Sequence, residues 1–112
     1  MKRAIPIGVL AILLVRPAMA KDTQFWNLTA STVKSLELAP AGSSTFGANQ
    51  TTNDPDGTVD HDERLKIKGV ATGAYDARLK LVDGRQCTVK GLRIEAGKVF
   101  AIEEKELVDC SH

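Results

Sequence analysis

The side chains best suited to chemistry lie in an acidic segment, residues 52–63, which reads Thr-Asn-Asp-Pro-Asp-Gly-Thr-Val-Asp-His-Asp-Glu. Its five carboxylates fall within ten residues, and like charges this close repel one another unless a partner neutralises them. A hard cation such as Ca²⁺ takes about six to eight oxygen ligands, which closely spaced carboxylates and a main-chain carbonyl can supply. The segment is therefore a candidate metal site.

The same segment resembles the calcium loop of the EF-hand family, including the lanthanide-binding variants of bacterial periplasmic proteins. With Gly57 at the sixth position, the apolar eighth position is Val59 and the closing carboxylate at the twelfth is Glu63. The resemblance implies binding of Ca²⁺ or a lanthanide through these ligands: Asp54, Asp56, the main-chain carbonyl of Thr58, Asp60 and Glu63. Two residues depart from the pattern, because Thr52 replaces the usual first carboxylate and Pro55 stiffens the fourth position. The flanking residues also read as loop and strand where the family has two amphipathic helices.

A structural interpretation of the acidic segment stays open beside the metal site. Asp54-Pro55-Asp56-Gly57 has the residue types of a β-turn, because Pro presets its own φ and Gly accepts a positive φ. The side chain of Asp54 can also accept a hydrogen bond from the main chain ahead of it. On this interpretation the carboxylates form a solvated acidic surface.

His61 offers a different chemistry, general base catalysis in a small hydrolase, with Asp60 or Glu63 orienting the imidazole. The sequence places no nucleophile beside His61, so an exposed loop histidine is the favoured interpretation. We therefore expect a protein that is not an enzyme.

Residues 1–20 have the three parts of a secretory signal peptide. Lys2 and Arg3 form a basic start, residues 5–15 form a short apolar stretch, and Ala18-Met19-Ala20 offers the small residues needed for cleavage. The apolar stretch is shorter than the about 20 residues that a membrane-spanning helix needs. We expect cleavage before Lys21, a periplasmic or secreted product, and no membrane span after processing.

The mature chain, residues 21–112, is the length of one small domain. It carries 12 basic and 14 acidic residues, a formal charge of −2, which argues against a nucleic-acid partner. Both cysteines, Cys87 and Cys110, lie in this part of the chain. An even number of cysteines in a small exported domain predicts one disulfide between them.

Alternation of apolar and polar residues predicts an all-β domain, a small antiparallel sandwich or open barrel of about six strands. We expect Trp26 in the core, a two-residue hairpin turn at Asp83-Gly84, and a β-bulge at Gly91. Residues 103–108 could extend the last strand or form a helical turn. The expected strands cover residues 24–29, 33–38, 64–68, 75–82, 85–94 and 99–102.

Residues 69–79 combine a Gly-rich turn with Tyr75 at the start of an alternating strand, which resembles transthyretin-like and carboxypeptidase-regulatory-like sandwiches. The mature chain also resembles small exported proteins of Gram-negative bacteria with an Asn-Asp-x-Asp-Gly loop (residues 53–57), a Gly-x-Tyr-Asp strand (residues 73–76) and a late cysteine. These resemblances imply a non-catalytic accessory module. We expect an exported binding module for a protein or small-molecule partner, with calcium or lanthanide binding through residues 52–63 as the alternative function.

Overall fold

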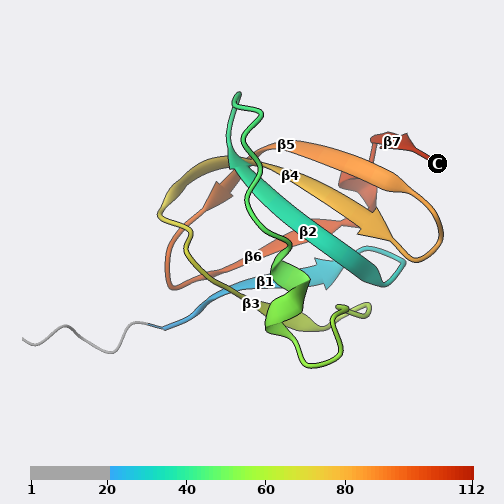
Figure 1. The fold of residues 1–112 in the computed structure, drawn as a ribbon, viewed down its shortest axis with the longest axis horizontal. Helices are drawn as coiled ribbons and strands as arrows, with labels where there is room; N and C mark the ends of the chain where they lie inside the picture. The colour runs from blue at the N-terminus through green and yellow to red at the C-terminus, as the bar shows by residue number, and fades with distance from the viewer. Residues whose placement is uncertain (1–20) are drawn as a thin grey trace, which may run out of the picture.

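A computed structural model describes residues 21–112, and the expected signal peptide, residues 1–20, lies outside the described residues. The described chain consists of strands joined by turns and loops, with two short 3-10 helices (Figure 1). The elements are β1 (Thr23–Leu28), β2 (Val33–Pro40), η1 (Gln50–Asn53), β3 (Arg64–Ile67), β4 (Gly73–Leu81), β5 (Gln86–Ile94), β6 (Val99–Glu103), η2 (Glu104–Glu106) and β7 (Asp109–Ser111).

The strands form two packed sheets, which confirms the predicted all-β fold (Figure 1). One sheet has the strand order β3-β1-β6 and the other has the order β2-β4-β5-β7. Paired strands run antiparallel with one exception, because β1 and β6 run parallel. β6 follows β5 in the chain, and β5 belongs to the opposite sheet. No hairpin connects β6 to β1, so the two neighbouring strands can run in the same direction.

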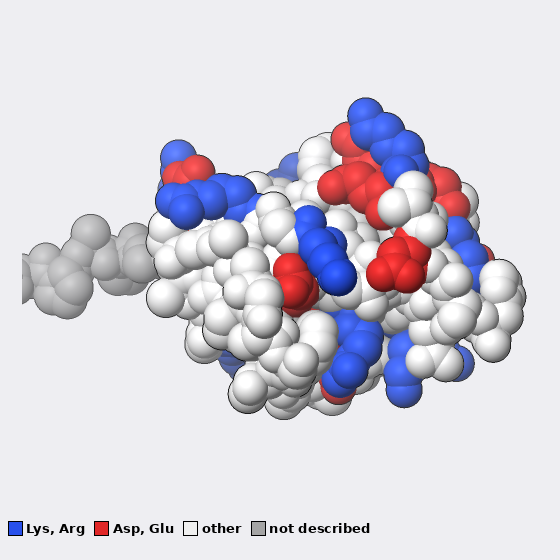
Figure 2. Space-filling view, turned by 90° about the horizontal axis from the view of Figure 1, so that it is seen from above, with Lys and Arg blue, Asp and Glu red and all other residues white. Residues whose placement is uncertain are grey.

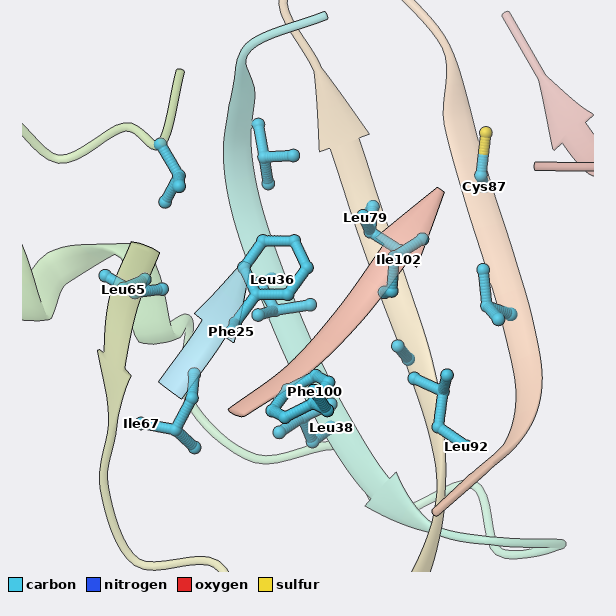
Figure 3. Close-up of a cluster of buried hydrophobic side chains, with 14 of the residues drawn as sticks. Phe25, Leu36, Leu38, Leu65, Ile67, Leu79, Cys87, Leu92, Phe100 and Ile102 are labelled. Atoms are coloured by element: carbon cyan, nitrogen blue, oxygen red, sulfur yellow. The ribbon is translucent and has the colours of Figure 1, made fainter. Parts of the chain in front are cut away.

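The core fills the space between the two sheets (Figure 3). Phe25 of β1 packs against Phe100 of β6 with their ring centroids 5.6 Å apart. Burying one large apolar side chain contributes about 1.5–3 kcal/mol, so the core is the main stabilising part of this small domain. Its largest fully buried apolar residues are Phe25, Leu36, Leu65, Leu79, Leu81, Ile94 and Ile102.

The expectation that Trp26 lies in the core is wrong. Thr23, Phe25 and Asn27 are the inward residues of β1, while Trp26 and Leu28 are half-buried on the outer face. Alternation predicts the period of a strand but not which of its two faces is buried. Phe25 determines the face here, and internal hydrogen bonds make the polar Asn27 acceptable in the core.

The strongest predicted strand pair, β4 with β5, is confirmed, but its turn differs from the expectation. Four residues, 82–85, join the two strands, and the Leu81 amide donates to the Arg85 carbonyl at 2.9 Å. Only Gly84 of the Asp83-Gly84 pair has a positive φ, +99°. The expected bulge is present opposite Asp76, where Gly91 has a φ of +72°.

The C-terminal segment resolves the alternative left open for residues 103–108. It forms the 3-10 helix η2 and then crosses to the other sheet, where β7 pairs with β5. Cys87 and Cys110 face each other in this pair and form the predicted disulfide.

Candidate functional site

The first half of the acidic segment is a β-turn, as the structural interpretation predicted. The Gly57 amide donates to the Asp54 carbonyl at 2.9 Å, and the Asp56 amide donates to Asp54 Oδ1 at 2.8 Å. Gly57 has a φ of +73°, a conformation that costs glycine little. Asp54 therefore uses one carboxylate oxygen to hold the turn.

The second half is a separate turn, residues 60–63. The Glu63 amide donates to the Asp60 carbonyl at 3.0 Å, and the Asp60 amide donates to Glu63 Oε1 at 2.9 Å. Between the two turns, Val59 is 1% exposed and exchanges two main-chain hydrogen bonds with Val33 of β2. This bridge anchors the segment to the sandwich between the two groups of carboxylates.

The predicted metal ligands are thus divided between two turns. Within residues 21–112, no three or more His, Cys, Asp or Glu side chains are grouped so that they could hold a metal ion. Asp54 and Glu63 serve main-chain amides, and Asp60 accepts a hydrogen bond from the Thr32 hydroxyl at 3.0 Å. A cation would have to draw these carboxylates together, so calcium binding stays a prediction from the sequence.

Calorimetric titration of the mature domain with Ca²⁺ and with Tb³⁺ tests this prediction. If residues 52–63 bind metal, the titration is stoichiometric and the Glu63→Gln variant abolishes it, because the variant removes the bidentate carboxylate. Bound metal also raises the melting temperature, since only the folded state holds the assembled ligands. Lys34→Gln, an exposed change on β2, serves as the control. A flat trace for the unaltered domain contradicts the calcium alternative.

His61 and Asp62 have structural contacts in this segment. His61 Nδ1 lies 2.7 Å from the Thr29 carbonyl, so this nitrogen donates to the main chain. Asp62 has a φ of +74°, and both its carbonyl and its Oδ1 accept from Trp26 Nε1, at 3.2 and 3.0 Å. The imidazole thus positions the loop, and the proposed pairing of His61 with a catalytic carboxylate stays a prediction.

The loop that precedes the acidic segment covers exposed edges of the two sheets. The outer edge of β2 is covered by residues 47–51: the Gly47 amide donates to the Leu38 carbonyl, and the Leu36 amide donates to Asn49 Oδ1, both at 2.9 Å. An uncovered strand edge exposes main-chain groups to pairing with other chains. The loop removes that exposure at β2.

The outer edge of β3 is covered by side chains of η1. Gln50 Nε2 donates to the Lys68 carbonyl at 2.9 Å, while its Oε1 accepts from the Lys68 amide at 3.0 Å. Asn53 Nδ2 donates to the Lys66 carbonyl at 2.8 Å. These two amides take the place of a neighbouring strand.

The remaining edges, β7 and β6, differ from each other. β7 has three residues and is tied down by the disulfide, and short edge strands present few groups for pairing. β6 has five residues and ends its sheet beside β1. Within residues 21–112, no strand pairs with the side of β6 that faces away from β1.

The register of β1 and β6 identifies the free groups on this edge. The Gln24 amide donates to the Lys98 carbonyl, so the even residues of this segment face β1. The amides and carbonyls of Val99 and Ala101 therefore point away from the sheet. Val99 is 42% exposed, and the Glu103 amide donates to Glu106 Oε1 at 2.8 Å, which ends the free edge.

The outer face next to this edge carries Trp26, which the sequence predicted to lie in the core. Trp26 lies between Arg64 of β3 and Ala101 of β6 in one cross-strand row. The Arg64 guanidinium lies 4.6 Å from the centroid of the Trp26 ring system, a cation–π distance. The alternation of residues in β1 would have predicted this outer face only if it had been known which of the two alternating sets of side chains points into the core.

Comparison with known proteins gives no relative from which a function could be inferred, so the proposal below rests on the geometry of the site. No family model, no curated protein and no solved structure matches the chain. The described residues also contain no helix long and apolar enough to cross a membrane.

Proposed function

We propose that the mature domain is a non-catalytic binding module of the exported compartment that takes up an extended segment of a partner protein as an added strand beside β6. The observation that carries the proposal is the difference between the edges. Loop and side-chain groups cover β2 and β3, and β7 is short, whereas β6 presents free main-chain groups at Val99 and Ala101. Strand addition to a free sheet edge is a recurrent mode of peptide recognition.

The energetics favour a specific but reversible complex. The two free residues offer two amides and two carbonyls, and each main-chain hydrogen bond contributes a net of about 0.5–1.5 kcal/mol. Side chains of the added strand would alternate between the outer face, beside Val99 and Ala101, and the sandwich interior. Partner choice would then depend on the outer face that contains Trp26 and Arg64.

Export is supported by the expected signal peptide and by the disulfide, because disulfides persist in oxidising compartments. The non-catalytic assignment is supported by His61, whose ring donates to a main-chain carbonyl and lies in a turn-forming segment.

Photo-crosslinking in the cells that produce the protein tests the proposal. A crosslinking amino acid replaces Val99 on the free edge or, as the control, Val82, which is 55% exposed in the β4–β5 loop. We expect an adduct of defined mass from position 99 only. The adduct should disappear in Ala101→Pro, which lacks the amide that faces a partner, and persist in Ala101→Ser, which keeps it.

Two results would contradict strand addition. One is a similar adduct from positions 99 and 82, which would indicate unspecific contact. The other is an adduct at position 99 that survives Ala101→Pro while the melting temperature shows that the variant is folded. If Ala101→Pro unfolds the domain, Val99→Lys replaces it, because a lysine on a free edge opposes pairing without altering the main chain.

A further inference from the structure

A pocket of about 270 Å³ lies on the other side of the molecule, between residues 42–46 and the outer face of β4 and β5. The loop folds back over the sheet because the Ala41 amide donates to the Ala74 carbonyl at 3.0 Å. Figure 2 shows Lys and Arg side chains next to Asp and Glu side chains on one face of the molecule. The pocket lies on the opposite sheet from β6, so it is independent of strand addition.

Asp76 forms the floor of the pocket. It is 8% exposed, and its two carboxylate oxygens accept from the Gly42 amide at 3.0 Å and the Gly91 amide at 3.1 Å. These hydrogen bonds, the one from Gly42 first, hold the pKa of Asp76 below its usual value. An ionised carboxylate therefore ties the loop to the β-bulge and sets the shape of the pocket.

The bulge and an aromatic ring position two cations at the pocket. Because the bulge adds one residue to β5, two successive residues, Lys90 and Gly91, are exposed on the outer face. Lys90 forms no ion pair with residues 21–112. Arg78 lies 4.1 Å from the centroid of the Phe46 ring. Its Nε and Nη2 both donate to Glu37 Oε1, at 2.9 and 2.8 Å, which holds the guanidinium in place.

The charges around the pocket decide what kind of ligand suits it. The positive charges of Arg78 and Lys90 are equal in number to the negative charges of Asp76 and of Glu37, the ion-pair partner of Arg78. The net formal charge of these four groups is zero, so it favours neither an anionic nor a cationic ligand. Together with the hydroxyl of Thr88, these groups offer donors and acceptors within one small space. The volume is below the about 300–1,000 Å³ typical of drug-sized ligands.

We propose that this pocket binds a single residue of a neutral sugar. Sugar hydroxyl groups both donate and accept, which matches mixed partners better than a ligand of one charge does. The donors are the guanidinium of Arg78 and the ammonium of Lys90, and Thr88 contributes a hydroxyl that can do both. Asp76 positions the loop, because each of its oxygens accepts from one main-chain amide, and the lone pairs that remain on the carboxylate are acceptors for sugar hydroxyls.

Amide NMR spectra recorded during titration with glucose, galactose and N-acetylglucosamine test the proposal. We expect saturable shifts at Ser44 and Thr88 with at least one of these sugars. Arg78→Ala and Lys90→Ala should each weaken binding about tenfold, as expected when about 1.4 kcal/mol of hydrogen bonding is lost. Lys80→Ala is the control, because Lys80 is exposed on the same face of β4 but outside the pocket.

Three outcomes overturn the proposal. The first is the absence of a saturable shift with all three sugars. The second is a saturable shift with sodium phosphate or sodium acetate in place of the sugars, which would make the pocket an anion site. The third is binding that Lys80→Ala weakens as much as Arg78→Ala does, because the contacts would then lie outside the pocket.

Discussion

Replacing Asn27 with alanine is expected to lower the free energy of unfolding by about 3 kcal/mol, because it leaves several buried polar groups without partners. Asn27 is 0% exposed. Its Nδ2 donates to the carbonyls of Ser31 and Val59, at 2.9 and 2.8 Å, and its Oδ1 accepts from the amide and hydroxyl of Thr29, at 3.0 and 2.7 Å. Urea unfolding followed by tryptophan fluorescence measures the loss.

Gln24→Ala is the matched control for Asn27→Ala. Gln24 lies on the same strand, is half-buried on the outer face, and its side chain forms no hydrogen bond with residues 21–112. We expect its replacement to change stability by no more than about 0.5 kcal/mol. Equal losses in the two variants would show that the network around Asn27 contributes no more than an ordinary surface position does.

Removing the disulfide by Cys87→Ala with Cys110→Ala is expected to cost about 3 kcal/mol, mainly because the unfolded chain gains freedom. The bridge closes a loop of 23 residues in sequence separation and holds β7, whose three residues form a short pairing with β5. Alanine is preferred to serine because Cys87 is buried, and a hydroxyl there would lose its hydrogen bonds to water. Urea unfolding of both proteins without reductant measures the difference.

Reduction of the unaltered protein provides the control for the disulfide prediction. With a reductant present, the unaltered protein and the double variant should have similar unfolding midpoints, because neither then has the cross-link. Amide exchange at Thr88 should become faster in both, since β7 is no longer held against β5. A loss below about 1 kcal/mol would mean that packing around Leu107 holds the C-terminal segment by itself.

Several elements could be predicted from sequence because their signals are local. The alternation of Leu65 with Ile67 identifies β3, and the alternation from Tyr75 to Leu81 identifies β4. The glycine at position 91 marks the bulge, since a positive φ is accessible to glycine at little cost. The disulfide was predictable from the count of cysteines in a small chain that we expect to be exported.

The acidic segment shows the limit of local signals. Its turn at residues 54–57 was predictable, because proline, aspartate and glycine favour that conformation wherever they occur together. The directions of its carboxylates were not, because they depend on the bridge from Val59 to Val33 and on contacts with Asn27 and Trp26. Those partners lie at least 26 residues away in sequence.

The sequence by itself determined strands β1 to β6, the turn at residues 54–57 and the covalent link, since each depends on neighbouring residues or on a simple count. Only the tertiary structure decided which face of β1 is buried, that β6 runs parallel to β1, and which edge of the sandwich is left free. Alternation has the same period on either face, so burial must be settled by distant residues such as Phe100. The edges, likewise, are covered by loop segments that come close to a strand only when the chain folds.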